Sequence, residues 1–176
     1  HCQLLLLDRD SAALAQVASD CQQQGANVSA LELDFASHDW LPQLQPLLQQ
    51  QGRVDLLVNN AGIADENDAD DINGWQRIMT INLDAPVRLT AACLPWMNRG
   101  GRIINIASIL GRAGKVRNTG YCASKHGLLG YSKALALELA PQGITVNAVL
   151  PGWVETPMLL RELNVQAEAI GSTSQQ

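Results

Sequence analysis

Residues 103–156 decide the fold in three blocks, which read IINIAS at 103–108, YCASKHGLLGYSKALALELA at 121–140 and GITVNAVLPGWVET at 143–156. The first and third blocks are short apolar runs typical of buried strands, and the middle block is long enough for a helix. A strand, a helix and a second strand in this order form a unit with parallel strands. Tyr121 and Lys125 lie four residues apart on that helix, so their side chains share one face.

The same alternation extends toward the N-terminus. We predict strands at 3–8, 28–33, 54–58, 102–107 and 144–149, and helices at 12–24, 37–50, 73–96 and 121–139. The strands are apolar throughout, which indicates a parallel sheet covered on both faces. Residues 1–176 are therefore predicted to form a single doubly wound α/β domain of the Rossmann type. Pro86 lies inside the third helix and predicts a kink there.

The composition narrows the possible functions. The chain has 176 residues, of which 47% are hydrophobic and 16% charged, as expected for a globular domain. A formal net charge of −5 without a Lys/Arg cluster argues against a nucleic-acid partner. The apolar runs are too short to cross a membrane. Four cysteines lack metal-binding spacing, so we predict no metal site and a reducing, cytoplasmic compartment.

Polar and small residues follow the predicted strands, where a doubly wound sheet binds its ligands. Asp8 ends the first strand, and an acid there bonds the ribose hydroxyls of NAD and repels the 2′-phosphate of NADP. Arg9 beside it favours NADP instead, because its guanidinium could bind that 2′-phosphate. Asp34 ends the second strand and is a candidate for the adenine amine or a simple turn former. The segment NNAG at 59–62 either lets the backbone approach a ligand closely or forms a plain turn.

A proton-transfer site is predicted around Tyr121. Removal of an alcohol proton needs a base with a pKa near neutral, whereas free tyrosine titrates near ~10. The Lys125 ammonium would stabilise the phenolate and lower its pKa, and Ser108 would hold the substrate oxygen. Asn82 lies in the middle of a helix before Pro86, which predicts a local opening where Asn82 holds a water. Each residue also has a purely structural alternative. Tyr121 could be a core residue, Lys125 a surface residue, and Asn82 a polar residue on a solvated helix face.

Taken in order, these residues resemble the short-chain dehydrogenase/reductase family. The resemblance implies hydride transfer between NAD(H) and a secondary alcohol or ketone. It makes Tyr121 the acid/base, Ser108 the orienting hydroxyl, Lys125 the partner of the phenol and Asn82 the anchor of a relay water. The expected cofactor contacts are Asp8, Arg9, Asp34, Phe35, Asn60, Ala61, Gly62, Ile106, Tyr121, Lys125, Pro151, Gly152, Val154 and Thr156.

The sequence departs from the family pattern at both ends. The glycine-rich turn and the first strand of the family, and its last strand, do not occur within residues 1–176. We therefore expect the natural chain to extend beyond both ends, with residues 157–176 beginning a substrate lid. The resemblance also implies a small-molecule substrate, no membrane partner and a homodimer or homotetramer.

NAD is the expected cofactor, with NADP less favoured, and two other functions stay open. One is an NADPH-dependent reductase of 3-oxoacyl thioesters, which uses the same chemistry. The other is a catalytically inactive dinucleotide-fold protein with a binding or regulatory role, which the absent glycine-rich turn favours. Residues 109–118 are expected to form the floor of the substrate pocket, and Trp153 either an apolar wall of it or part of the core.

Overall fold

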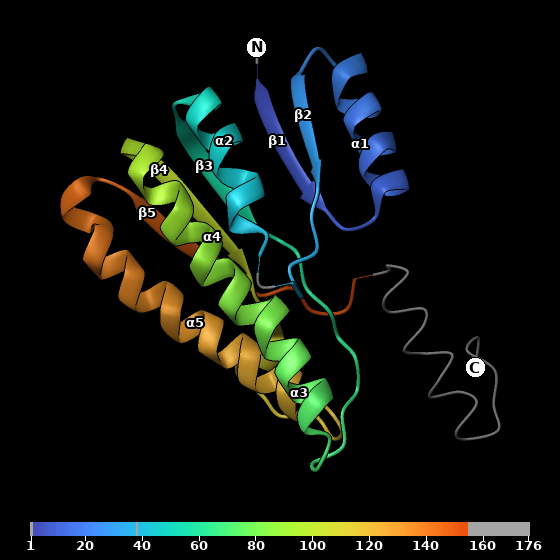
Figure 1. Ribbon diagram of the computed structural model, residues 1–176. Helices are drawn as coiled ribbons and strands as arrows, with labels where there is room; N and C mark the ends of the chain where they lie inside the picture. The colour runs from blue at the N-terminus through green and yellow to red at the C-terminus, as the bar shows by residue number, and fades with distance from the viewer. Residues whose placement is uncertain (1, 38, 155–176) are drawn as a thin grey trace.

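The computed structural model describes residues 2–37 and 39–154 as alternating strands and helices (Figure 1). The strands are β1 (Gln3–Asp8), β2 (Asn27–Glu32), β3 (Val54–Asn59), β4 (Met97–Ile106) and β5 (Thr145–Val149). The helices are α1 (Ser11–Gln23), α2 (Leu41–Gln51), α3 (Ile72–Met79), α4 (Ala85–Cys93) and α5 (Thr119–Leu139). Every pair of neighbouring strands is parallel, which confirms the predicted α/β fold of the Rossmann type.

The strands form two separate groups, β1–β2 and β3–β4–β5. Among the described residues, β1 and β3 are each paired on one edge only, and the family resemblance places a further strand at this position. The prediction that every strand is buried on both faces is therefore wrong here. β1 contains no buried residue, and Leu56 and Val58 of β3 are 53% and 45% exposed.

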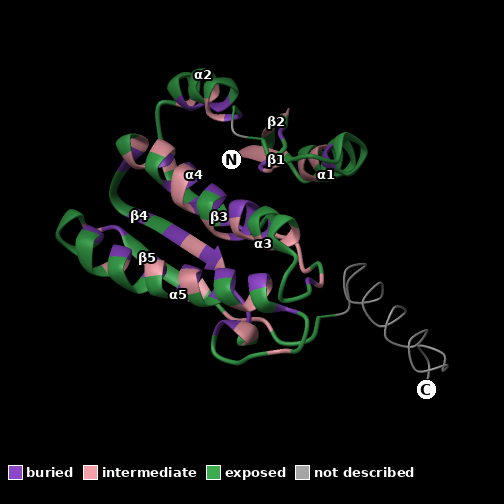
Figure 2. Cartoon of the chain, turned by 60° about the horizontal axis from the view of Figure 1, so that its bottom comes forward, coloured by how far each residue is buried: buried purple, intermediate pink, exposed green. Residues whose placement is uncertain are grey.

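The core lies where α2, α4 and α5 cover one side of the three-stranded group (Figure 1). Leu57 of β3 and Ile103 of β4 point into this core, and Ile103 is fully buried. Leu44, Leu89 and Leu135 contribute from the three helices. Figure 2 shows that buried positions follow the inner sides of the helices, whereas their outer sides are exposed. Burial of these apolar faces fixes the helices over the sheet.

The predicted helix at 73–96 is helical throughout, but its centre and its last turn are not α-helix. A π-helical turn at Thr80–Asp84 separates α3 from α4, and Pro86 lies in the first turn of α4. Proline has no N–H to donate to the carbonyl four residues earlier, so the preceding turn widens. After Cys93 the chain forms a short 3₁₀ turn, and β4 already begins at Met97.

The other boundaries shift by smaller amounts. α2 begins at Leu41 instead of residue 37, because Pro42 is accommodated in the first turn of a helix. The predicted loop before α5 contains a short 3₁₀ turn at Ile109–Gly111, and α5 begins at Thr119. Within residues 2–37 and 39–154, no helix is long and apolar enough to cross a membrane. The expected lid at 157–176 lies outside the described residues.

Candidate active site

A cleft of about 630 Å³ lies at the carboxyl ends of all five strands. Asp8 reaches it from β1, Asp34 from the end of β2, and Ser108 from the end of β4. Gly62 follows β3, and Gly152 follows β5. The convergence is a direct consequence of the parallel arrangement, because parallel strands end at the same edge of a sheet. Segments far apart in the sequence therefore line one cavity.

Ser108 lies in the turn that leaves β4. The β4–β5 pairing continues beyond the strands, since Ala107 N–H donates to the Val149 carbonyl and Ile109 N–H to the Pro151 carbonyl. These two bonds hold the ends of β4 and β5 together. The Ser108 hydroxyl accepts a hydrogen bond of 3.1 Å from Leu110 N–H, which begins the following 3₁₀ turn. The hydroxyl is consequently held at the wall of the cleft and is 7% exposed.

Tyr121 and Lys125 lie in the first turns of α5 and both line the cleft. The Lys125 Nζ donates to the Ile106 carbonyl at 2.9 Å, which ties the helix to the end of β4. The same nitrogen lies 5.6 Å from the centroid of the Tyr121 ring. The lysine is 4% exposed, so the surface position considered from the sequence is wrong.

Burial changes the pKa values of both side chains. Removal from water lowers the pKa of Lys125 from 10.5 to about 8, because the charged form loses hydration. Burial also raises the pKa of Tyr121, and a hydrogen bond with Ser108 acts in the opposite direction with a smaller effect. The lowered tyrosine pKa predicted from the pair is therefore not found for the chain alone. A positively charged nicotinamide in the cleft would act to lower it.

Asn82 occupies the π-helical turn and is fully buried, which excludes a solvated helix face. Its amide makes two 2.8 Å hydrogen bonds with Ile63, accepting from the backbone N–H and donating to the carbonyl. The amide also donates to the Ser124 hydroxyl at 3.3 Å. The predicted local opening is confirmed, but the side chain braces the segment after β3 against α5. Both amide hydrogens of Asn82 are used in these bonds, so the predicted water would have to bind to an oxygen of this residue.

Gly62 illustrates how closely these segments approach each other. A Cβ atom at this position would lie 3.2 Å from Asn82 Oδ1 and 3.5 Å from Lys125 Nζ. A side chain would therefore press on Asn82 Oδ1 and touch Lys125 Nζ, whereas the close approach of the NNAG backbone to a ligand stays a prediction. The amide of Asn59 braces two neighbouring strands, since its Nδ2 donates to Asn105 Oδ1 of β4 at 2.7 Å.

The predicted adenosine end of the cleft contains Asp8, Arg9, Asp34 and Phe35. One carboxylate oxygen of Asp8 accepts from Asp10 N–H at 2.9 Å, and one of Asp34 accepts from Ala36 N–H at 2.9 Å. Each acid therefore forms a local turn and retains a second oxygen for a ligand. Phe35 is 8% exposed because its ring packs edge-to-face on Trp40.

The structure brings together every predicted site residue within its described part except Asn82, which lies behind the cleft wall. Thr156 lies outside the described residues. Sequence reasoning missed five apolar lining residues, whose positions beside strand ends or in the π-helical turn were the available signal: Leu33, Ile63, Ala64, Ile81 and Ala107. No group of three or more potential metal ligands occurs in residues 2–37 and 39–154.

Comparison with known proteins agrees with this geometry. The family model described as "short chain dehydrogenase" matches residues 1–166. The chain belongs to the short-chain dehydrogenase family. Membership of this family explains the parallel strands, the residues that follow the strand ends, and the helix that carries Tyr121 and Lys125.

Individual family members show the same relationship. The granaticin polyketide synthase putative ketoacyl reductase 1 of Streptomyces violaceoruber is 42% identical over 165 residues, covering 89% of this chain and 60% of the relative. A crystal structure of an actinorhodin polyketide ketoreductase with NADPH is 34% identical with a TM-score of 0.84, covering 97% of this chain and 68% of that one. A xylitol dehydrogenase bound to NAD⁺ is 27% identical with a TM-score of 0.84, covering 94% and 66%. The chain thus spans about three fifths of the curated relative's length.

Proposed function

We propose that this chain forms the catalytic part of an oxidoreductase that transfers hydride between NAD(H) and a secondary alcohol or ketone. The observation that carries the proposal is the convergence of Ser108, Tyr121 and Lys125 on one cleft at the strand ends. In alcohol oxidation, the carbinol C–H would give its hydride to a bound nicotinamide, and the O–H bond would break with its proton passing to the Tyr121 phenolate. Ketone reduction reverses both transfers, and Ser108 orients the reacting oxygen.

The cleft has features suited to a dinucleotide. The nicotinamide, when bound, supplies the hydride acceptor or donor. Asp8 and Asp34 would hold the adenosine end, each through its second carboxylate oxygen. Ile106, Pro151 and Gly152 would line the nicotinamide end, and the small residues Ala61 and Gly62 would let the backbone approach the cofactor.

The Asp8→Ala variant is expected to reduce the preference for NADH over NADPH by about tenfold, because a charge-assisted hydrogen bond to the ribose is lost. The full-length protein should prefer NADH, and kcat/KM for the two cofactors measures the ratio. The matched control is Asp10→Ala, which removes a neighbouring acid that caps α1 through Ala13 N–H. Equal or better use of NADPH by the parent would contradict the proposed preference.

A second candidate is an NADPH-dependent reductase of 3-oxoacyl thioesters. Arg9 lines the cleft beside Asp8 and would suit a 2′-phosphate. Two curated relatives are named ketoacyl reductases of polyketide synthases, and other relatives are named D-beta-hydroxybutyrate dehydrogenases. If this second candidate is correct, the enzyme should reduce a 3-oxoacyl thioester with NADPH more efficiently than it oxidises simple alcohols with NAD.

A substrate panel tests the proposed function directly. Polyols, hydroxysteroids and 3-hydroxyacyl thioesters would be supplied to the full-length protein with NAD or NADP, and formation of reduced nicotinamide recorded. We expect at least one secondary alcohol to be oxidised with NAD. Tight cofactor binding without turnover of any member would instead favour the inactive binding protein. We also propose that the enzyme is a homodimer or homotetramer, which light scattering would test.

A further inference from the structure

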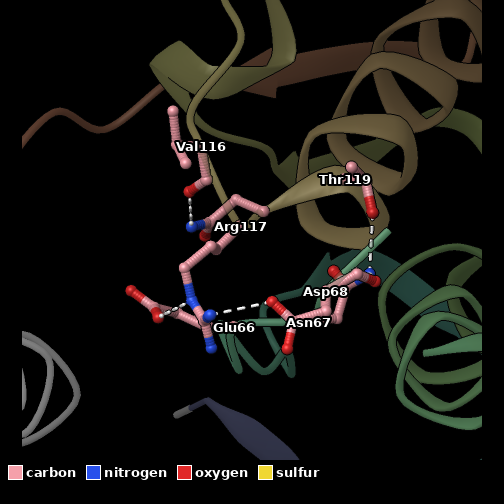
Figure 3. A network of polar contacts seen from close by, with 7 residues as sticks. Glu66, Asn67, Asp68, Val116, Arg117 and Thr119 are labelled. Atoms are coloured by element: carbon pink, nitrogen blue, oxygen red, sulfur yellow. Dashed lines mark hydrogen bonds and ion pairs between the residues drawn. The ribbon is translucent and has the colours of Figure 1, made fainter. Parts of the chain in front are cut away.

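The loop after β3 and the loop before α5 are joined by a group of polar contacts close to the site (Figure 3). Arg117 Nε donates to Glu66 Oε2 at 3.0 Å, and Arg117 Nη1 lies 2.8 Å from Asp68 Oδ1. Asn67 N–H donates to the Arg117 carbonyl at 2.8 Å. We call Glu66, Asn67, Asp68 and Arg117 the clamp. It joins segments about fifty residues apart in the sequence.

Asn67 is the buried member of the clamp, with 2% of its surface exposed. Its Oδ1 accepts a hydrogen bond of 3.0 Å from Gly120 N–H, and its Nδ2 donates to Thr119 Oγ1 at 2.7 Å. Both partners are in the first turn of α5. The first N–H groups of a helix have no partner within the helix, and here one of them is satisfied from a separate loop.

The helix does not cap itself. Its N-cap residue Asn118 makes no capping hydrogen bond with its side chain, which donates to the Val116 carbonyl at 3.0 Å instead. Gly120 fits tightly against the clamp, since a Cβ there would lie 3.3 Å from Asn67 Oδ1 and 3.2 Å from Ile78 Cδ1. The position of this turn therefore depends on Asn67.

The remaining members of the clamp hold Asn67 in position. Arg117 has a φ of 57°, and it is the only non-glycine residue with positive φ in residues 2–37 and 39–154. This left-handed conformation is unfavourable for arginine unless its surroundings hold it in place. The two ion pairs with Glu66 and Asp68 are solvent-exposed and individually weak. Together with the Asn67–Arg117 backbone bond, they fix the conformation of the loop.

We propose that Asn67 is a positioning residue for Tyr121, which follows Gly120 directly and is the acid/base of the function proposed above. Capping from the separate loop fixes the first turn of α5, and that turn sets where the phenol lies relative to Ser108. Hydride transfer is sensitive to such placement, because a displacement of about 1 Å can cost roughly a hundredfold in rate.

The test compares Asn67→Ala with Asp71→Ala in the full-length protein. Asp71 is in the same loop and caps α3 in the same way, accepting from Gly74 N–H at 2.9 Å, but α3 carries none of the three reacting groups. We expect Asn67→Ala to lower kcat by about tenfold to a hundredfold, with KM for the cofactor little changed. Amide hydrogen exchange should accelerate at Gly120 and Tyr121 in this variant alone. Asn67→Asp retains an acceptor for Gly120 N–H and should restore both protection and most of kcat.

Unchanged exchange at Gly120 and Tyr121 in Asn67→Ala would overturn the proposal. An equal fall of kcat in Asp71→Ala would also overturn it, because loss of stability alone would then explain the effect. If the parent protein transfers no hydride, the proposed function fails. The exchange measurement still decides in that case whether Asn67 holds the first turn of α5.

Discussion

The Tyr121→Phe variant is expected to transfer hydride about a thousandfold more slowly than the parent. Proton transfer by a positioned side chain typically contributes about 10²–10⁴-fold to the rate. The substitution removes only the phenolic oxygen, so the ring stays in place beside Lys125. Cofactor binding should therefore persist, since Asp8, Asp34 and the small residues of the cleft are unchanged. Single-turnover measurements with saturating cofactor would separate the lost chemical step from binding.

Tyr131 provides the matched control, since it is the other of the two tyrosines in the chain and lies on the same helix. Its hydroxyl is half-buried and forms a hydrogen bond with Thr90, and burial raises its pKa as it does that of Tyr121. Tyr131→Phe should leave kcat within about twofold and lower the free energy of unfolding by about 1 kcal/mol. A Tyr121→Phe enzyme as active as this control would show that the proposed acid/base is wrong.

The sequence was sufficient to predict where the site residues come together, for a simple physical reason. Apolar runs separated by helices indicate parallel strands, and parallel strands end at one edge of the sheet. Asp8, Asp34, Ser108 and Gly152 could be placed in one cleft from this rule alone. No side-chain geometry was needed, because the topology fixes the location.

Features that depend on burial or on contacts between distant loops could not be predicted in this way. The direction of the Tyr121 pKa follows from desolvation, which an i,i+4 spacing does not reveal. The Asn82 amide bonds Ile63 instead of facing an open space, and Asn67 caps a helix that begins about fifty residues later. Asn67 lies in a loop rich in acidic residues, and its neighbours in the sequence carry no signal of this contact.

The Lys125→Met variant is expected to gain stability while losing activity. Burial lowers the lysine pKa from 10.5 to about 8, so the folded state pays for holding the charge at neutral pH. Methionine fills a similar volume without a charge and should raise the free energy of unfolding at pH 7 by about 1–3 kcal/mol. The loss of the Nζ–Ile106 hydrogen bond offsets part of this gain. Hydride transfer should fall by about a hundredfold or more, because the phenolate loses its neighbouring cation.

The sign of the pH dependence distinguishes this explanation from a simple loss of packing. The folded pKa lies below the unfolded one, so between pH 8 and 10.5 the unfolded chain binds more protons at Lys125. The stability difference between the parent and Lys125→Met, measured by denaturant unfolding without cofactor, should therefore shift in favour of the parent across this window, whereas the raised pKa of buried Cys93 acts equally on both proteins. Lys125→Met should lack that contribution, whereas Lys133→Met, at an exposed position of the same helix, should retain it. A destabilised Lys125→Met protein would mean that the hydrogen bond to Ile106 outweighs the cost of burying the ammonium, and the lysine would then stabilise the fold as well as the phenolate.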